Sequence, residues 1–236
     1  MFSKVNDLFP QRIICLTEES VETLYLLGKE DLIFGVSAFV KRPAQAQKLP
    51  KVSFFTTSNY KKIISKKPDL IIGHSDIQKD IARDLIELGQ NVFIANHRSI
   101  TGILQYIQLL SRVVGAEDEG IKLHARLIEQ INKAQDFTKN LQKKPKVYFE
   151  EWDEPLISGI QWVSELIELC GGIDITAHRA KAILAKDRIG NHEEVIAANP
   201  DIIFGCWCGK KVKIEAITSG DGYQDIEAVK KGRVFE

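Results

Sequence analysis

Residues 117–141, EDEGIKLHARLIEQINKAQDFTKNL, have the pattern of one long amphipathic helix. The stretch opens with three acidic residues, which suit the positive end of a helix. Apolar residues then recur at spacings of three and four, which is the helical period; they are Leu123, Leu127, Ile131, Ala134, Phe137 and Leu141. Such a helix would be about 37 Å long, the width of a small domain. Pro145 lies beyond its end and cannot continue it.

The sequence partly repeats itself on either side of this helix. KPDLIIG at residues 67–73 matches NPDIIFG at residues 199–205. A Glu-Glu pair follows an apolar run at residues 18–19 and again at residues 150–151. Both features recur at the same offset of 132 residues. Two different features at one offset indicate two halves of like design.

We therefore predict an α/β fold in which two lobes with parallel sheets are joined by one long interlobe helix, with a cleft between the lobes. The expected domains are an N-terminal lobe at residues 1–115, the interlobe helix at 116–144 and a C-terminal lobe at 145–236. One α/β domain with a long surface helix is the alternative that the pattern leaves open.

Composition excludes several classes of protein. The 32 basic and 32 acidic residues balance, so the chain lacks the basic footprint of a nucleic-acid-binding protein. No apolar run is long enough to span a bilayer, so we expect no membrane insertion. Residues 1–11 lack the apolar core and cleavage site of a secretory signal. We expect a cytoplasmic protein as numbered, and a periplasmic or cell-surface one if a leader was removed.

Apolar runs bounded by turn residues alternate with helical patterns along the chain. Strands are predicted at residues 12–17, 32–37, 69–73, 91–95, 146–151 and 201–205. The helices between them are predicted at residues 59–66, 76–88, 99–114, 162–170 and 193–198. Residues 176–188 give no clear pattern. The alternation predicts parallel sheets with right-handed crossovers.

Open parallel sheets bind ligands beyond the carboxyl ends of their strands. The chemically informative residues at those positions are Glu18, Glu19, Phe39, His74, His97, Arg98, Glu150, Glu151, Trp152, Trp207 and the cysteines beside Trp207. Each also has a structural interpretation, since tryptophans pack at interfaces, histidines cap helices and acids favour helix N-termini. Neighbouring residues of a strand point to opposite faces, so at most one of Glu150 and Glu151 faces a ligand directly.

No motif indicates catalysis. Cys206 and Cys208 are separated by one residue, which is closer than the usual zinc pair and is not a C-x-x-C redox motif. The chain has no G-x-G-x-x-G, Walker A, G-x-S-x-G or H-E-x-x-H sequence. We therefore predict a non-enzymatic protein without catalytic or metal-ligating residues, with a soft-metal or redox site at the two cysteines as an alternative.

The order of short motifs resembles that of the substrate-binding proteins of ABC importers for cobalamin, haem and iron-siderophores. The motifs are RIICLT at residues 12–17, IFGVS at 33–37, KLPKV at 48–52 and AVKKGRVF at 228–235. The most specific signature is YFEEWDEPLISG at residues 148–159 together with WCGKK at 207–211. It resembles a leaderless branch often described as cobalamin-binding.

This resemblance implies a helical-backbone periplasmic-binding-protein fold that holds a cobalamin-type corrinoid in the cleft and requires no cofactor. Aromatic side chains would stack on such a metal chelate while polar groups orient its rim. The implied ligand-binding residues are Glu18, Phe39, His74, His97, Glu151, Trp152 and Trp207. Haem, an iron-siderophore or a transition metal is the alternative ligand. A cytoplasmic thiol or redox protein that uses Cys206 and Cys208, and a purely partner-binding module, are the alternative functions.

The resemblance also implies docking to an ABC permease through one exposed Glu on each lobe. Glu193 matches the second-lobe position, but Lys61 stands where the first-lobe Glu is expected. A lysine there would repel an arginine of the permease, so we expect weakened docking. Proteins of this type normally carry a last helix after the Gly-Arg-Val segment, whereas this chain ends at Glu236. We therefore expect a C-terminal lobe that is truncated or lacks the closing helix.

Overall fold

The computed structural model describes residues 8–207 and 209–236, which form two compact α/β units. Unit 1 contains the chain up to His97 and Thr101–Leu127, and unit 2 contains Arg98–Ile100 and Ile128–Glu236. The division falls within one long helix, α5 (Glu117–Thr138). The prediction of two α/β lobes with a long helix is confirmed.

Unit 1 is built on a five-stranded sheet in the order β3-β2-β1-β4-β5. All four strand pairs are parallel. The strands are β1 (Ile13–Cys15), β2 (Ile33–Ser37), β3 (Lys51–Ser53), β4 (Leu70–His74) and β5 (Val92–Ala95).

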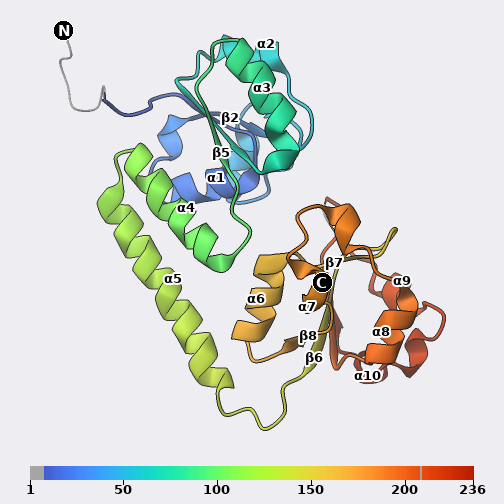
Figure 1. Ribbon diagram of the computed structural model, residues 1–236. Coiled ribbons are helices and arrows are strands. Elements are labelled where there is room, and N and C mark those ends of the chain that lie inside the picture. The colour runs from blue at the N-terminus through green and yellow to red at the C-terminus, as the bar shows by residue number, and fades with distance from the viewer. Residues whose placement is uncertain (1–7, 208) are drawn as a thin grey trace. The chain divides into compact units, whose positions relative to one another are not determined.

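Helices cover both faces of this sheet, as Figure 1 shows. Ile13 and Cys15 of β1 pack into one core with α1 (Glu18–Leu26) and α4 (Ile100–Val113). Ile14 and the adjoining Leu16 pack into the other core with α2 (Tyr60–Ser65) and α3 (Lys79–Glu87). The apolar run predicted as a buried strand is thus buried on both faces, as a central parallel strand must be. Short 3-10 turns complete the unit: η2 (Glu30–Leu32), η3 (Ala44–Lys48) and η4 (Asp76–Gln78).

Unit 2 has a second five-stranded sheet centred on β6 (Lys146–Trp152). Its other strands are β7 (Ile157–Ser158), β8 (Ile173–Asp174), β9 (Ile202–Gly205) and β10 (Val234–Phe235). β8 and β9 run parallel to β6, and β10 runs parallel to β9. β7 is antiparallel to β6, which differs from the prediction of purely parallel sheets. The reversal arises because the four residues after β6 form a turn that returns the chain directly beside it.

Helices also cover both faces of the second sheet (Figure 1). α6 (Gln161–Leu169) packs on one face through Val163 and Ile167. The other core contains Tyr148, Trp207 and Tyr223, packed with the helices around β9. The remaining helical elements of the unit are α7 (Ala177–Ala180), η5 (Ala185–Arg188), α8 (His192–Ala198), α9 (Ile214–Thr218), η6 (Tyr223–Asp225) and α10 (Glu227–Lys230). The stretch without a clear pattern, residues 176–188, is thus two short helical turns.

In the structure, the repeat extends beyond the Pro-Asp match that the sequence shows. Asn59 caps α2 by accepting a hydrogen bond from the Lys62 N–H, and Asn191 caps α8 by accepting one from the Glu194 N–H. After each helix comes one residue with a left-handed backbone, Lys67 or Asn199, both with φ 49°. The same helix, turn and strand are therefore built twice, at the offset of 132 residues that the sequence shows.

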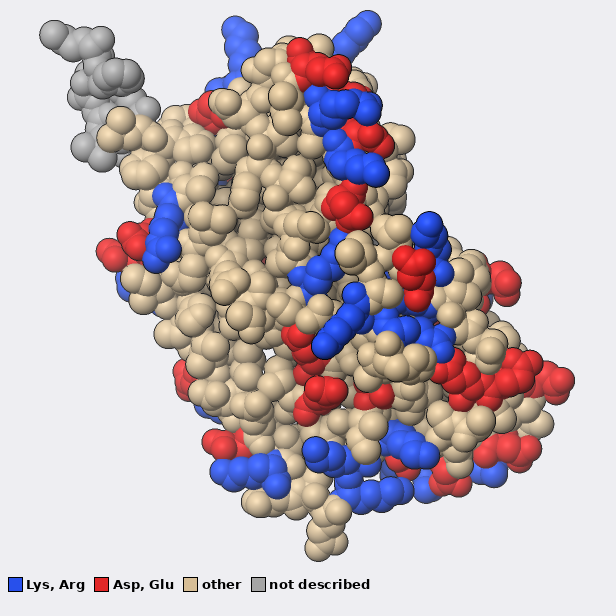
Figure 2. Space-filling view, viewed as in Figure 1, with Lys and Arg blue, Asp and Glu red and all other residues tan. Residues whose placement is uncertain are grey.

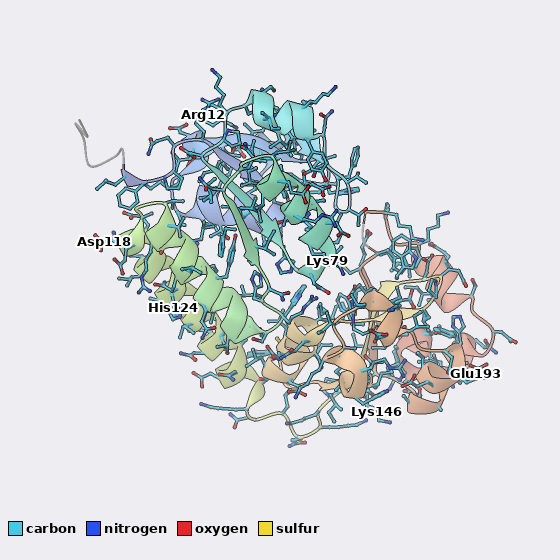
Figure 3. All side chains as sticks on the ribbon, turned by 45° about the horizontal axis from the view of Figure 1, so that its top comes forward. Arg12, Lys79, Asp118, His124, Lys146 and Glu193 are labelled. Carbon is cyan, nitrogen blue, oxygen red and sulfur yellow. The ribbon has the colours of Figure 1, made fainter. Side chains whose placement is uncertain are left out.

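The aspartate of each Pro-Asp pair has a defined structural role. Asp69 accepts hydrogen bonds from the backbone N–H groups of Gln11 (2.7 Å) and Arg12 (2.9 Å), immediately before β1. Asp201 accepts one from the N–H of Lys146 (2.9 Å), the first residue of β6, which Figure 3 labels. This backbone hydrogen bond is the main reason that the pKa of Asp201 is lowered. Each aspartate thus fixes the start of the central strand of its unit.

The long helix is three residues shorter than predicted, because α5 ends at Thr138 rather than at Leu141. The Leu141 N–H bonds to the Thr138 carbonyl in a turn that leads the chain toward β6. The predicted apolar stripe is buried only in part, since Leu123 lies in the core of unit 1 and Phe137 is 85% exposed. Near its start α5 packs very closely on α4, where a Cβ on Gly120 would lie 2.1 Å from Ser111 Oγ.

The surface agrees with the balanced charge of the sequence. Figure 2 shows Lys and Arg side chains interspersed with Asp and Glu on the face in view. Within residues 8–207 and 209–236, no helix combines the length and hydropathy that crossing a bilayer requires.

The matched left-handed residues give a test of the repeat. We expect Lys67→Asn to raise the free energy of unfolding of unit 1 by up to about 1 kcal/mol, because Asn adopts a left-handed backbone at lower cost than Lys. The reverse change, Asn199→Lys, should destabilise unit 2 by a similar amount. Hydrogen exchange of β4 and β9 would measure each unit separately. Destabilisation by Lys67→Asn would contradict this account.

Candidate functional site

Two histidines predicted from sequence meet at the carboxyl edge of the first sheet. His74 is the last residue of β4, and His97 lies two residues beyond β5. These strands are parallel neighbours, so their ends lie side by side. The two imidazole rings have centroids 4.6 Å apart and are inclined at 48°.

The histidine pair continues into a row of stacked aromatic rings. The centroid of Tyr106, on α4, lies 4.8 Å from that of His97. Tyr106 in turn stacks on Phe93 of β5 at 6.3 Å. Tyr106 is buried, and this burial raises the pKa of its hydroxyl. Tyr106 and Phe93 therefore pack behind His97 on the side of the hydrophobic core, and His74 forms the outer end of the row.

An acid lies beside this outer end. Glu19, in the first turn of α1, places Oε1 4.0 Å from Nδ1 of His74 and accepts a 2.5 Å hydrogen bond from the Thr17 hydroxyl. Burial raises the pKa of Glu19, and the Thr17 hydrogen bond opposes that shift. The predicted residue Glu18 is its exposed neighbour. Sequence reasoning therefore found the acidic pair, but proximity to His74 distinguishes Glu19.

Phe39 contributes an apolar surface to unit 1. It follows β2, is 43% exposed and meets Phe54 edge to face, with centroids 6.0 Å apart. Exposed aromatic rings of this kind suit contact with a large apolar ligand.

In unit 2, Glu150 and Trp207 form a buried pair at the carboxyl edge of the second sheet. Glu150 is 3% exposed and Trp207 is 5% exposed. The indole Nε1 of Trp207 donates a 2.9 Å hydrogen bond to Oε1 of Glu150. Burial raises the pKa of Glu150 to about 7, partly opposed by this hydrogen bond.

A lysine that sequence reasoning did not assign covers both predicted tryptophans. The Nζ atom of Lys210 lies 4.3 Å from the ring centroid of Trp152 and 4.7 Å from that of Trp207. It also pairs with Asp153 at 2.6 Å. Lys210 thus occupies a ring face of each indole through cation–π contacts. Its place in the Trp-Cys-Gly-Lys-Lys signature is the sequence signal that could have found it.

Glu151, the other predicted acid, is engaged in an ion pair. Its carboxylate accepts hydrogen bonds from both terminal nitrogens of Arg188, at 2.6 and 2.9 Å. Arg188 is 3% exposed and also donates to the Ser158 carbonyl. A bidentate pair of this kind holds both groups in a fixed geometry. Arg188 falls in the stretch that had no clear sequence pattern, so nothing in the sequence linked it to Glu151.

Cys206 is part of no metal cluster among the described residues, and its thiol is not activated. Burial, together with the charges of Glu151 and Glu236, raises the pKa of the Cys206 thiol. Reactive cysteines normally have the opposite shift. Cys208, the second cysteine of the redox alternative, lies outside the described residues. Among the described residues, no group of three or more His, Cys, Asp or Glu side chains could hold a metal ion.

The two candidate surfaces define a class of protein. Each α/β unit presents aromatic and acidic side chains beyond the carboxyl ends of its parallel strands, where α/β proteins bind ligands. Residues 13–236 match the family model described as periplasmic binding protein. The chain therefore belongs to the periplasmic binding protein family.

Similar proteins with a named ligand include one curated relative and two solved structures. A vitamin B12-binding protein of Vibrio cholerae is 30% identical over 210 residues, which are 83% of this chain and 71% of that protein. The crystal structure of a periplasmic vitamin B12 binding protein of Vibrio cholerae matches at 25% identity with a TM-score of 0.76, covering 96% of this chain and 87% of the other. A periplasmic heme-binding protein from Roseiflexus sp. RS-1 matches with a TM-score of 0.82 over 95% and 88% of the two chains. Its 22% identity makes that a likeness of fold alone.

The buried carboxyl of Glu150 predicts a specific dependence of stability on pH. Its pKa rises from 4.5 to about 7 on folding, so the folded state holds this proton more tightly than the unfolded state. Stability should fall as pH rises between these values and then level off, with a total loss of about 3 kcal/mol. Glu150→Gln, which cannot ionise, should lack this loss.

Denaturant unfolding of both proteins at about pH 5 and pH 8 would measure the difference. Tryptophan fluorescence reports on unit 2, because Trp152, Trp162 and Trp207 all belong to it. Equal pH dependence in the two proteins would show that Glu150 has an ordinary pKa.

Proposed function

We propose that this protein is a non-enzymatic binding protein for a cobalamin-type corrinoid and serves an ABC importer. The observation that carries the proposal is the 30% identity to a vitamin B12-binding protein over most of this chain. A binding protein needs affinity for its ligand and a way to release it, but no covalent step. Each unit supplies apolar and polar side chains suited to a large ring ligand.

The proposed contacts combine apolar surface with polar groups for orientation. In unit 1, Phe39 offers an exposed ring, and His74, His97 and Glu18 offer polar groups. In unit 2, Trp152 offers an indole, and Glu151 is held rigidly by Arg188. Trp207 is buried, so its contribution would be to support Trp152, Lys210 and Glu150.

Two alternative ligands are haem and an iron-siderophore, which the same kind of surface can accommodate. The heme-binding relative supports this alternative less directly, because its likeness concerns the fold alone. A bare transition metal is disfavoured, since the described residues contain no cluster suited to one. A thiol-based function is disfavoured by the raised pKa of Cys206.

The importer role requires docking to a permease outside the cytoplasm. The solved vitamin B12-binding relative is named as periplasmic, which favours the second of the two locations expected from sequence. Glu193 is exposed in the first turn of α8, where Figure 3 labels it. Lys61 is exposed at the matching place in α2. We propose that Glu193 docks and that Lys61 weakens the contact of unit 1.

Titration of the ligand-free protein with cyanocobalamin tests the ligand. We expect saturable binding with micromolar or tighter affinity, followed by absorbance and by quenching of tryptophan fluorescence. Trp152→Ala should weaken binding by about 1–3 kcal/mol if its indole stacks on the ring. Trp162→Ala on α6 is the matched control, because Trp162 lies outside the proposed contacts.

The same titration should be made with haem and with a ferric siderophore. Binding of either one without binding of cyanocobalamin would replace the corrinoid by that ligand. An unchanged affinity of the Trp152→Ala protein would assign Trp152 to packing.

Docking can be tested separately with an ABC permease reconstituted in lipid vesicles. We expect Lys61→Glu to strengthen association, because it restores the acidic charge that pairs with a permease arginine. Lys62→Glu, at the exposed neighbouring position, is the control and should have a smaller effect. Association that is the same for Lys61→Glu and the unmodified protein would remove Lys61 from the docking surface.

A further inference from the structure

Unit 2 contains a pocket of about 300 Å³, and Trp207 is the one predicted ligand-binding residue among those that line it. Glu150 and Trp207 line it from the carboxyl ends of β6 and β9. His192 lines it from the first turn of α8, and Tyr223 from η6. The pocket therefore lies at the carboxyl edge of the second sheet.

Glu150, the least accessible acid of this pocket, has one carboxylate oxygen that no described residue hydrogen-bonds and that is not fully buried. Glu150 accepts from Trp207 through Oε1 only. In the part of the chain that the structure describes, its second oxygen has no hydrogen-bond donor. A carboxylate offers about four lone-pair sites, and a buried one is stabilised by donors that reach the others. The backbone of β6 holds Glu150 in place, so the donor for this oxygen is either water or a ligand group that enters the pocket and displaces it.

The other polar groups around the pocket are mainly acceptors or are already paired. The Tyr223 hydroxyl lies 3.0 Å from Nδ1 of His192. Lys210 pairs with Asp153 and lies over the tryptophan rings, so it acts on Glu150 through its charge and not through a hydrogen bond. Glu154 adds another carboxylate at the rim. At a pH above the Glu150 pKa of about 7, a ligand group that itself accepts, such as a carboxylate, would meet the Glu150 carboxylate without a donor between them.

We propose that this pocket receives a side-chain amide on the rim of the ligand and that Glu150 accepts a hydrogen bond from its N–H group. The inference rests on the proposed function and gives a physical reason for the protein to prefer a corrinoid over haem. A corrinoid carries amide side chains, whereas haem carries carboxylates. Glu150 would therefore favour the first ligand and oppose the second, because a site built to accept hydrogen bonds rejects a group that cannot donate.

Glu150→Gln separates this contact from packing. Gln keeps an oxygen for the Trp207 N–H and replaces the second acceptor by an NH₂ group of nearly the same size. At about pH 8 we expect the affinity for cyanocobalamin to fall about tenfold to a hundredfold, as for loss of a hydrogen bond to a charged group. The affinity for haem should stay the same or increase. Glu215→Gln, on the exposed side of α9, is the control and should bind both ligands as the unmodified protein does.

A chemical change in the ligand gives a second measurement that does not depend on the variant alone. Cobalamins with one side-chain amide hydrolysed to a carboxylate should include one that binds the unmodified protein about tenfold or more weakly. That loss should shrink in the Glu150→Gln protein, whose NH₂ group can donate to the new carboxylate.

The outcomes distinguish this inference from the proposed function. If the unmodified protein binds no cobalamin, the proposed function fails. If it binds cobalamin, and the Glu150→Gln protein binds every one of these ligands with the same affinities, this inference alone is overturned. Circular dichroism of the Glu150→Gln protein would show that any loss of affinity is not a loss of folding.

Discussion

Asp69 and Asp201 each hold the first strand of a unit through the backbone N–H groups at its start. These hydrogen bonds join two segments that lie more than fifty residues apart in the sequence. They set β4 beside β1 and β9 beside β6 in a fixed register. Because the register decides where each strand ends, it also decides which side chains meet at the opposite edge of the sheet.

The candidate surfaces are a consequence of that register. His74 and His97 can stack because β4 and β5 end at neighbouring positions. Glu150 and Trp207 can pair because Glu150 lies opposite Gly205, the last residue of β9. Side chains that are far apart in the sequence thus become neighbours through backbone pairing alone. Each unit can form its surface independently of the other.

Sequence patterns were sufficient for the features that depend on local periodicity or on repetition. They placed α5, the strands that carry the Pro-Asp pairs, and the histidines at the strand ends. They could not decide between Glu150 and Glu151, because alternation in a strand shows that neighbours face opposite ways but not which face is covered. The structure pairs Glu151 with Arg188 and leaves Glu150 lining a pocket. The contacts of Lys210 with two indoles depend on loop geometry, which has no periodic signal.

The repeated segment that runs from Asn59 to Asp69 and from Asn191 to Asp201 carries opposite charges in its two copies. Lys61 and Lys62 stand in the first turn of α2, and Glu193 and Glu194 stand in the first turn of α8. Acids suit a helix N-terminus and lysines do not, so the basic copy gains nothing in stability from its charge. Two copies of one backbone motif therefore present opposite charges at the start of their helices. A surface that attracts the first turn of α8 by its charge would repel the first turn of α2, so the two units differ in the partners they favour although they share this backbone motif.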